Sequence, residues 1–283
     1  MTDLAQQDRR SALRHVQALP PTLMIGGVIT LAWIAIALAA PALTSYNPIA
    51  VDVAQALKPP SAQHWLGSDA IGRDVLTRIL YGARYDLAMA FFGVVGPIIL
   101  GTIVGLVSGY FGGPMDSLLM RIFEVTVSFP YFVLVIAIVA VLGPGLQSYF
   151  ISLTLVNWVS YARLVRSQAL VLRGADFVLA ARGMGLGHGR IMLFHILPNA
   201  IIPSVVFVMT DAVLAIVLGS SLGFLGLGVQ PPTPEWGAMI AEGQTYLTTA
   251  WWISIFPGFA VCSLALGLSL VADGLARVLR TGP

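Results

Sequence analysis

Four basic side chains interrupt a chain that otherwise carries few charges. The stretch FVLAARGMGLGHGRIMLFHILPNAIIP, residues 177–203, holds Arg182, His188, Arg190 and His195 among the glycines at 183, 185, 187 and 189. A basic, glycine-rich run of this kind could bind a phosphate or a dinucleotide, or it could contact another protein. The surrounding sequence decides between these chemistries.

The surrounding sequence does not support a nucleotide-binding site. Lys58, in ALKPP, is the only lysine, so the chain has no GxxxxGK[ST] phosphate-binding loop. The run GMGLG resembles part of a dinucleotide fingerprint, but that fingerprint must follow a buried strand, which is missing here. The sequence also has no HExxH motif and no nucleophile elbow. We therefore expect no catalytic residue, no bound cofactor and no metal site in this chain, and we expect it not to be an enzyme.

The composition is that of an integral membrane protein. The 283 residues are 57% hydrophobic and 10% charged, with a mean hydropathy of +0.87. A soluble domain needs a polar face on nearly every element, which this composition cannot supply. The single cysteine, Cys262, excludes an internal disulfide framework.

About six segments are long and apolar enough to cross a bilayer, which takes roughly 20 residues. Pro144 and its neighbouring glycines, in LGPG at 142–145, divide one long charge-free stretch into two of these segments. The first segment is longer than the apolar core of a secretory signal, so we interpret it as a retained anchor. The expected all-α segments are about 21–43, 87–110, 119–142, 146–165, 199–225 and 248–272.

The arginines predict how these segments are oriented, because basic residues are retained on the cytoplasmic side. One side would hold the N-terminal tail 1–20, the connection between the fourth and fifth segments, and the tail 276–283. The other side would hold the segment 44–86, where basic and acidic residues offset each other. Both termini are therefore expected in the cytoplasm. The arginines on the cytoplasmic side are Arg9, Arg10, Arg14, Arg163, Arg166, Arg173, Arg182, Arg190, Arg277 and Arg280.

The glycine-rich stretch that begins at Phe177 is then expected in the cytoplasm, in a coupling segment of about 166–195. Asp176 is a candidate N-cap for a short helix that runs through Met184. Gly185 and Gly187 could adopt the left-handed geometry that ends it, and Pro198 suits the first turn of the next helix. A short helix with so many apolar residues outside the bilayer predicts contact with a protein partner. Its apolar residues are Phe177, Val178, Leu179, Ala180, Ala181 and Met184.

Three further features suggest packing or function. Residues 69–83 place apolar and polar side chains on opposite halves of a helix, which predicts a helix in the interface plane. Glycines 101, 105 and 109 would let a second helix approach closely. Glu124 and Asp211 are isolated acids within predicted spans, and either could line a substrate path or be satisfied structurally.

Three stretches resemble the inner-membrane permease subunits of binding-protein-dependent ABC importers, in the oligopeptide, dipeptide and nickel branch. HWLGSDAIGRDVLTRILYGAR at 64–84 is similar to the external signature of that branch, including Gly67, Asp69, Gly72, Arg73, Asp74, Arg78, Tyr81, Gly82 and Arg84. FLGLGVQPPTPEWG at 224–237 is similar to the segment after the fifth span. The cytoplasmic stretch resembles the coupling motif through Ala180, Ala181, Gly185, Leu197 and Pro198. Together the likeness covers about residues 20–280.

This resemblance implies a type I importer fold and a division of labour among subunits. The chain would form half of a translocation path for di- or oligopeptides, together with a second, different permease chain. Two cytoplasmic ATPase subunits would bind ATP and Mg, and a soluble binding protein would deliver substrate at the bacterial inner membrane. The implied contacts to the ATPase are Asp176, Phe177, Leu179, Ala180, Ala181, Arg182, Met184, Gly185, Leu186 and Gly187.

The sequence departs from the family pattern at two positions, and two alternative functions stay open. Leu179 stands where the coupling motif usually has glutamate, and Gly219 stands where this branch often has an intramembrane glutamate. The substrate could be nickel or another small solute. The chain could also be an ion-coupled carrier acting alone, with Glu124 and Asp211 as coupling sites. We expect no nucleic-acid partner, and we expect contact with membrane lipid.

Overall fold

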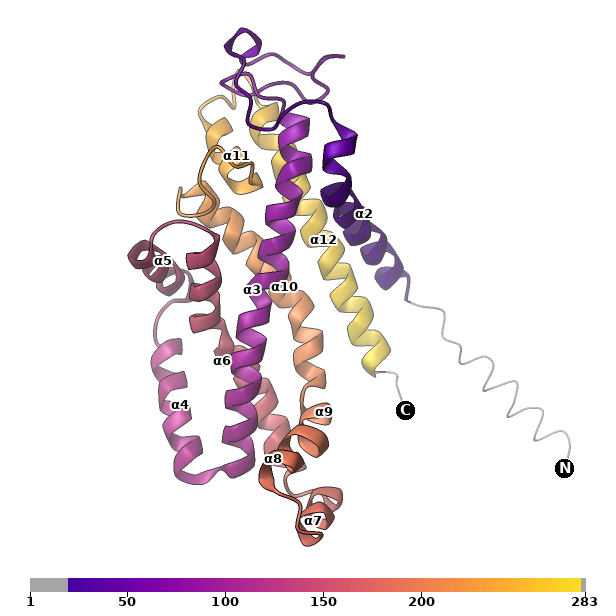
Figure 1. Ribbon diagram of the computed structural model, residues 1–283, viewed down its shortest axis with the longest axis vertical. Helices are drawn as coiled ribbons and strands as arrows, with labels where there is room; N and C mark the ends of the chain where they lie inside the picture. The colour runs from indigo at the N-terminus through magenta and orange to yellow at the C-terminus, as the bar shows by residue number, and fades with distance from the viewer. Residues whose placement is uncertain (1–19, 281–283) are drawn as a thin grey trace, which may run out of the picture.

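The computed structural model describes residues 20–280, which form an all-α bundle with no strand among them (Figure 1). The all-α prediction is therefore confirmed. Most of the expected tail 1–20, with Arg9, Arg10 and Arg14, lies outside the described residues. The helices are α2 (Pro21–Leu43), α3 (Val75–Phe111), α4 (Gly113–Val127), α5 (Tyr131–Leu142), α6 (Leu146–Leu172), α7 (Asp176–Gly183), α8 (His188–Ile191), α9 (Leu197–Ala200), α10 (Ile202–Phe224), α11 (Trp236–Gln244) and α12 (Trp252–Arg280). A short 3₁₀ turn, Val53–Gln55, and a π-helix, Met192–Ile196, complete the described elements.

The expected spans differ from these helices mainly in their number and their ends. Four helices, α2, α3, α10 and α12, are long and apolar enough to cross a membrane, and a fifth span results if α4 and α5 count as one. That pair is bent by 88° at Ser128–Pro130, within the single span expected over about 119–142. The fourth expected segment, 146–165, corresponds to α6, which is long enough with 27 residues but is not among the helices apolar enough to count as a span. Residues 276–280, expected in a tail, continue α12.

The helix α3 is the central element, and α6 packs along it. A Cβ atom placed on Gly101 would lie 2.4 Å from the carbonyl oxygen of Trp158, and one on Gly105 would lie 2.4 Å from that of Ala162. A Cβ atom on Gly109 would lie 2.7 Å from the carbonyl oxygen of Arg166. The predicted glycine ladder is confirmed, because any side chain at these positions would force the two helices apart.

The predicted interfacial helix over 69–83 is wrong. Residues 75–83 are the first turns of α3, which begins after Asp74 caps it by accepting a hydrogen bond from the amide of Thr77 at 2.7 Å. Of the apolar side, Val75, Ile79, Leu80 and Ala83 are buried within the bundle, Leu76 is half-buried and Ile71 is exposed. The polar residues Arg73, Asp74, Thr77 and Arg78 are buried as well. An isolated helical wheel assigned these residues to water because it did not include the acidic groups that reach them from α11 and from the loop before α3.

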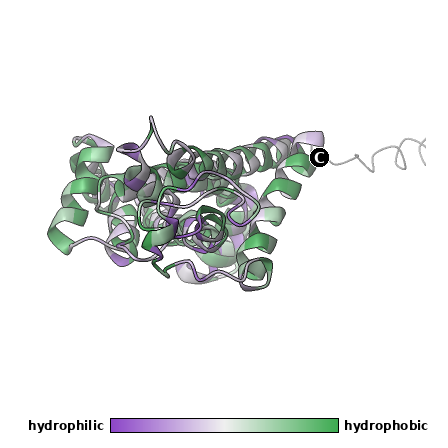
Figure 2. Ribbon diagram, turned by 90° about the horizontal axis from the view of Figure 1, so that it is seen from above, coloured by the Kyte–Doolittle hydropathy of each residue, from purple (hydrophilic) through white to green (hydrophobic). Residues whose placement is uncertain are grey.

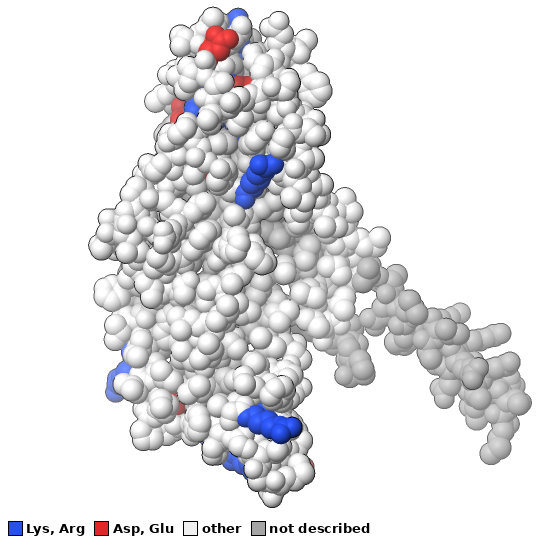
Figure 3. Space-filling view, viewed as in Figure 1, with Lys and Arg blue, Asp and Glu red and all other residues white. Residues whose placement is uncertain are grey.

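The two ends of the bundle are formed by different elements. The helix α7 marks one end, and α11 with the long 44–74 connection marks the other (Figure 1). The helix α2 begins and α12 ends on the α7 side. Charged side chains gather toward both ends of the visible face, with a largely uncharged surface between them (Figure 3). Seen from above, hydrophobic residues cover the outlying helices, and hydrophilic residues lie in the connecting loops (Figure 2).

Candidate coupling and translocation sites

The helix α7 contains six of the ten predicted coupling residues, and Met184, Gly185, Leu186 and Gly187 follow its last residue, Gly183. The local geometry differs from the prediction at Asp176 and at Gly187. The N-cap residue is Ala175, while Asp176 lies in the first turn, where a negative charge favours the helix dipole. Gly185 has a φ of +77° and ends the helix as predicted, with its amide donating to the carbonyl of Arg182 at 2.9 Å. Gly187 has a φ of −66°, so the prediction of left-handed geometry there is wrong.

One face of α7 is fixed to the rest of the bundle. Val178 and Ala181 are buried against Tyr110 near the end of α3 and against Ile191 of α8. The guanidinium of Arg182 lies 5.0 Å from the centre of the Tyr110 ring, and the Tyr110 hydroxyl and His188 Nδ1 are 2.8 Å apart. Arg182 thus links α7 to α3 through its contact with the Tyr110 ring, and His188 of α8 contacts the same tyrosine through its hydroxyl.

The opposite face of α7 is exposed and apolar. The exposed fractions are 44% for Phe177, 50% for Leu179 and 74% for Met184. Asp176, Ala180, Arg182, Gly185 and Gly187 are also exposed, Leu186 is half-buried, and Ala181 is buried. Of the ten predicted contact residues, eight can therefore reach a partner directly.

Sequence reasoning missed an exposed pair that follows α8. Leu193 and Phe194, in the π-helix Met192–Ile196, are 55% and 72% exposed, and with Arg190 and His195 they line a hollow of about 550 Å³. The sequence feature that could have indicated this surface is the pair of large apolar residues between Arg190 and His195.

A second missed contact ties α4 to α6 near the α7 end. Asp116 accepts two hydrogen bonds from Arg166, from Nε to Oδ1 and from Nη2 to Oδ2, both at 2.6 Å. Ser108 of α3 also donates to Asp116. This bidentate arrangement is the strong form of a carboxylate–guanidinium pair. It places three helices in a fixed relation next to α7.

The two acids predicted within spans have different surroundings. Glu124 is exposed on α4 and pairs with the exposed Arg121 at 3.2 Å. Asp211 of α10 is 2% exposed, and it accepts a hydrogen bond from the Tyr161 hydroxyl at 2.8 Å and another from the Asn157 amide. The two acids share no hydrogen-bonding partner.

At the α11 end, a closed charge network joins the loop before α3 to α11. Asp69 Oδ2 accepts hydrogen bonds from Arg73 Nε and Arg78 Nη1, both at 2.6 Å. Glu242 Oε2 of α11 accepts from Arg73 Nη2 at 2.7 Å and from Arg78 Nη1 at 2.6 Å. Two arginines and two carboxylates thus neutralise each other, and Glu242 is the member that sequence reasoning missed. The sequence feature that could have indicated this role is that Glu242 lies in a connection, 226–247, that has no basic residue to pair with it.

The fourth predicted external residue, Asp74, lies beside this network in separate contacts. Its Oδ1 lies 2.9 Å from Nδ1 of the buried His64. Its Oδ2 accepts the capping hydrogen bond from Thr77. Asp69, Arg73, Asp74 and Arg78 are thus all buried, and none of their charged groups projects from the surface.

The stretch 224–237 contributes another buried acid, Glu235, which sequence reasoning did not single out. Its two oxygens accept hydrogen bonds from the amides of Gly237 at 2.7 Å and Ala238 at 2.8 Å, so it caps α11. Asp86 of α3 accepts from the amide of Trp236 at 3.3 Å. Burial raises the pKa of Glu235 to about 7. The first turn of α11 is therefore bound by two carboxyl groups.

Gly219 of α10, the second departure from the family pattern, lies in a tight contact. A Cβ atom there would lie 2.4 Å from Sδ of Met89 and 3.4 Å from the hydroxyl of Tyr149. A glutamate side chain would have to displace Met89. Among residues 20–280, no cluster of three or more His, Cys, Asp or Glu side chains is arranged to hold a metal ion.

Comparison with known proteins finds a matching family model and relatives that are similar over most of the chain. Residues 101–282 match the family model described as "binding-protein-dependent transport system inner membrane component". The dipeptide transport system permease protein DppC of Alkalihalophilus pseudofirmus is 43% identical over 90% of this chain and 84% of its own length. The probable D,D-dipeptide transport system permease protein DdpC of Escherichia coli is 37% identical over 92% of this chain and 87% of its own length.

Solved structures show the same fold at lower identity. A chain of the MetNI methionine ABC transporter in an inward-facing conformation aligns with a TM-score of 0.56 at 20% identity, over 73% of this chain and 95% of that one. A chain of an amino acid ABC transporter crystallised with histidines aligns with a TM-score of 0.53 at 16% identity, over 72% of this chain and 94% of that one. At these identities the likeness supports the fold and nothing finer.

Proposed function

Because the chain belongs to the family of binding-protein-dependent transport system inner membrane components, we propose that it is the permease subunit of a bacterial ABC importer for short peptides. It forms half of a translocation path, and a second, different permease chain forms the other half. The names of its relatives, which are dipeptide permeases, support the substrate class. Di- or oligopeptides are delivered from outside by a soluble binding protein.

The helix α7 is the contact to the ATPase subunits in this proposal. The observation that carries it is the division of α7 into two faces, with Val178 and Ala181 buried and Phe177, Leu179 and Met184 exposed. An exposed apolar surface outside the bilayer favours a protein partner. ATP and Mg bind to those partner subunits. Their closure displaces α7 together with Tyr110 and α3, and it thereby biases the bundle between two discrete arrangements.

The α7 end faces the cytoplasm and the α11 end faces outward. Arg163, Arg166, Arg182 and Arg190 lie in α6, α7 and α8, and Arg173 is the C-cap residue of α6, which supports this orientation because basic residues are retained inside. The described ends of α2 and α12 lie on the same side as α7, so both termini are cytoplasmic (Figure 1).

Glu124 and Asp211 have different roles. A charged pair such as Arg121 and Glu124 is costly in hydrocarbon, so this face of α4 lies against water or against the second permease chain. Asp211 has its hydrogen bonds met by Tyr161 and Asn157, which favours a structural role between α6 and α10.

The test is transport by the assembled importer in liposomes. We expect uptake of a labelled dipeptide that requires ATP, the binding protein and both permease chains. An ion gradient without nucleotide should drive none. Uptake by this chain alone under an ion gradient would contradict the proposal and favour an ion-coupled carrier.

A further inference from the structure

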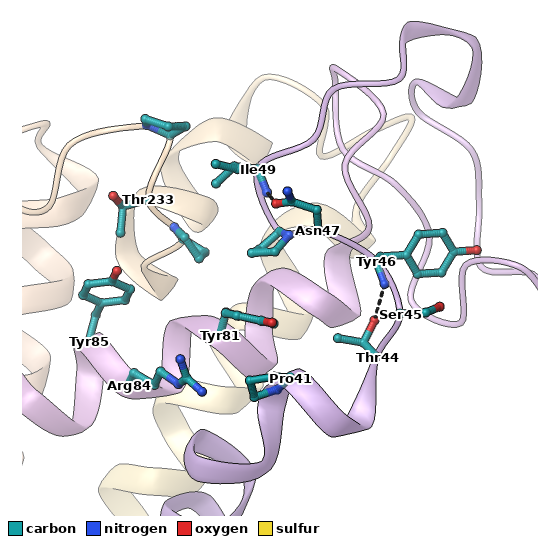
Figure 4. Close-up of a pocket in the computed structure, with 13 residues that line it drawn as sticks. Pro41, Thr44, Ser45, Tyr46, Asn47, Ile49, Tyr81, Arg84, Tyr85 and Thr233 are labelled. Carbon is teal, nitrogen blue, oxygen red and sulfur yellow. Dashed lines mark hydrogen bonds between the residues drawn. The ribbon is translucent and has the colours of Figure 1, made fainter.

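A pocket of about 700 Å³ opens at the α11 end of the bundle, outside the contacts described so far. Three separate segments line it: the end of α2 with residues 44–49, the turn 81–85 of α3, and the loop 232–234. Figure 4 shows Tyr85 and Thr233 on one side of the space, Asn47 and Ile49 on the other, and Arg84 and Tyr81 along its base. Its volume is within the range of small-molecule sites.

Arg84 is the one charged residue that lines this pocket. Its neighbours Arg73 and Arg78 are buried and bound to carboxylates, whereas Arg84 is exposed and has no ion pair with any described residue. The groups around it are uncharged. Hydroxyl and amide side chains come from Thr44, Ser45, Tyr46, Asn47, Tyr81, Tyr85 and Thr233.

The sequence explains why Arg84 is held in place. Pro41 lies inside α2 and has no amide hydrogen, so the carbonyl of Ala37, one turn earlier, lacks its helical donor. Arg84 Nε donates to that carbonyl at 2.7 Å, and its guanidinium lies 5.2 Å from the centre of the Tyr81 ring. The Nε contact and the ring fix the guanidinium plane. Its two terminal amino groups have no hydrogen-bond partner among the described residues.

A fixed guanidinium with free terminal donors is suited to a carboxylate, which it binds through two parallel hydrogen bonds. The hydroxyls of Tyr81 and Tyr85 also have no hydrogen-bond partner in the described part of the chain, and they add neutral donors to the same pocket. With no acidic side chain in the lining, the pocket favours an anion over a cation.

We propose that this pocket binds the C-terminal carboxylate of the imported peptide at the outer entrance of the path, with Arg84 as the anchoring residue. This inference rests on the proposed function of peptide import. The pocket lies between the outward loops, and its size accommodates a dipeptide. A short peptide always carries one terminal carboxylate whatever its side chains, so Arg84 would hold different peptides by a group that they share.

The test compares two peptides and two permeases in the full importer. Wild-type and Arg84→Gln importers are assayed for ATP-dependent uptake of Ala-Ala and of Ala-Ala amide, which lacks the carboxylate. Any preference of the binding protein for a carboxylate is the same in both importers, so it cancels in the comparison. We expect Arg84→Gln to slow Ala-Ala uptake by about 10- to 100-fold more than amide uptake, as for loss of hydrogen bonds to a charged group.

Arg84→Lys is the matched control, because it keeps the charge and loses the two-pronged geometry. We expect it to lie between wild type and Arg84→Gln for Ala-Ala and to match wild type for the amide. An equal loss for both peptides in Arg84→Gln would show that Arg84 only positions α2, and it would overturn the proposal. An effect that follows the content of anionic lipid in the liposomes, and not the peptide carboxylate, would overturn it in favour of a lipid headgroup.

A second measurement reads the pocket without transport. In the assembled permease with Cys262→Ser and Thr233→Cys, Ala-Ala should slow maleimide labelling of residue 233, and the amide should not. Equal labelling rates with the two peptides would contradict the proposal. If the wild-type importer takes up no peptide, the proposed function fails, and protection of residue 233 still shows whether the pocket binds a carboxylate.

Discussion

The two ends of the bundle differ in how far their charged residues are buried. At the α11 end, Asp69, Arg73 and Arg78 are buried and bound to one another and to Glu242. At the α7 end, the charges are mostly exposed, and so are the apolar side chains of Phe177 and Met184. The network of Asp69, Arg73, Arg78 and Glu242 satisfies its charges internally, whereas the apolar residues of α7 are left exposed.

This difference relates to what each end must do in the proposed transport cycle. A closed charge network holds the loop before α3 to α11, so the outer end moves as one unit. The α7 end is bound to α3 through Tyr110 on one side and free on the other, which is the arrangement expected of a lever that another protein moves. Substitutions at the two ends should therefore affect different measurements.

The largest expected effect is at the α11 end, from Arg78→Ala. The substitution leaves Asp69 and Glu242 short of a cation in a buried site, and breaking a buried pair in this way costs about 3–5 kcal/mol. Thermal unfolding of the purified protein should show this loss of stability. Lys58→Ala, at an exposed residue of the same end, is the control and should change little. A melting temperature equal to that of wild type for Arg78→Ala would show that the network does not hold this end together.

Glu235 is the exception within the α11 end, because it is buried and its hydrogen bonds come from backbone amides. Burial raises its pKa from 4.5 to about 7, so the folded state binds this proton more tightly than the unfolded state. Its contribution to stability is complete below about pH 4.5 and is lost as the pH rises to about 7, up to about 3 kcal/mol in total.

Glu235→Gln should therefore flatten the dependence of unfolding free energy on pH between 4.5 and 7. Glu242→Gln is the matched control on the same segment, and it should lower stability without removing that dependence. Denaturant unfolding measured across this pH range distinguishes the two. If wild type becomes more stable as the pH rises through this window, the direction assigned to Glu235 is wrong.

The sequence predicted those parts of the fold that depend on local pattern. The helix α7, the left-handed Gly185 and the glycine ladder of α3 follow from residue types at fixed spacing. The bend between α4 and α5 and the burial of Arg73 and Arg78 could not be predicted in this way. They depend on residues distant in the chain, such as Glu242, which lies 164 positions from Arg78.

The candidate pocket shows the same limit. Arg84 belongs to the stretch that resembles the external signature, but it forms a site with Pro41 and Thr233 only because α2, α3 and the loop after α10 converge. The free carbonyl of Ala37 is predictable from Pro41, but the donor that meets it is not. Contacts between distant segments therefore account for most of what sequence reasoning missed.

At the α7 end, Met184→Asp should alter partner binding and leave stability nearly unchanged. Met184 is 74% exposed, so a charge there costs little in the isolated chain, but it would be buried against an ATPase subunit without a partner. We expect affinity for the ATPase to fall by about tenfold or more, measured by co-purification and by peptide-stimulated ATP hydrolysis. Val171→Asp, on an equally exposed residue at the end of α6, is the control. Equal ATPase binding by Met184→Asp and wild type would remove α7 from the interface.

The smallest expected effect comes from Leu179→Glu, which introduces the residue that the coupling motif usually carries at this position. Leu179 is 50% exposed and lies in the first turn of α7, where a carboxylate favours the helix dipole, so stability should change by less than about 0.5 kcal/mol. If the apolar face of α7 is what the ATPase recognises, affinity should change by no more than about threefold, because Phe177 and Met184 remain. Leu179→Ala removes the same apolar side chain without adding charge, so comparing the two variants in the co-purification assay isolates the contribution of the carboxylate. A gain of tenfold or more for Leu179→Glu alone would mean that a charge contact determines docking, and the apolar surface would then be secondary.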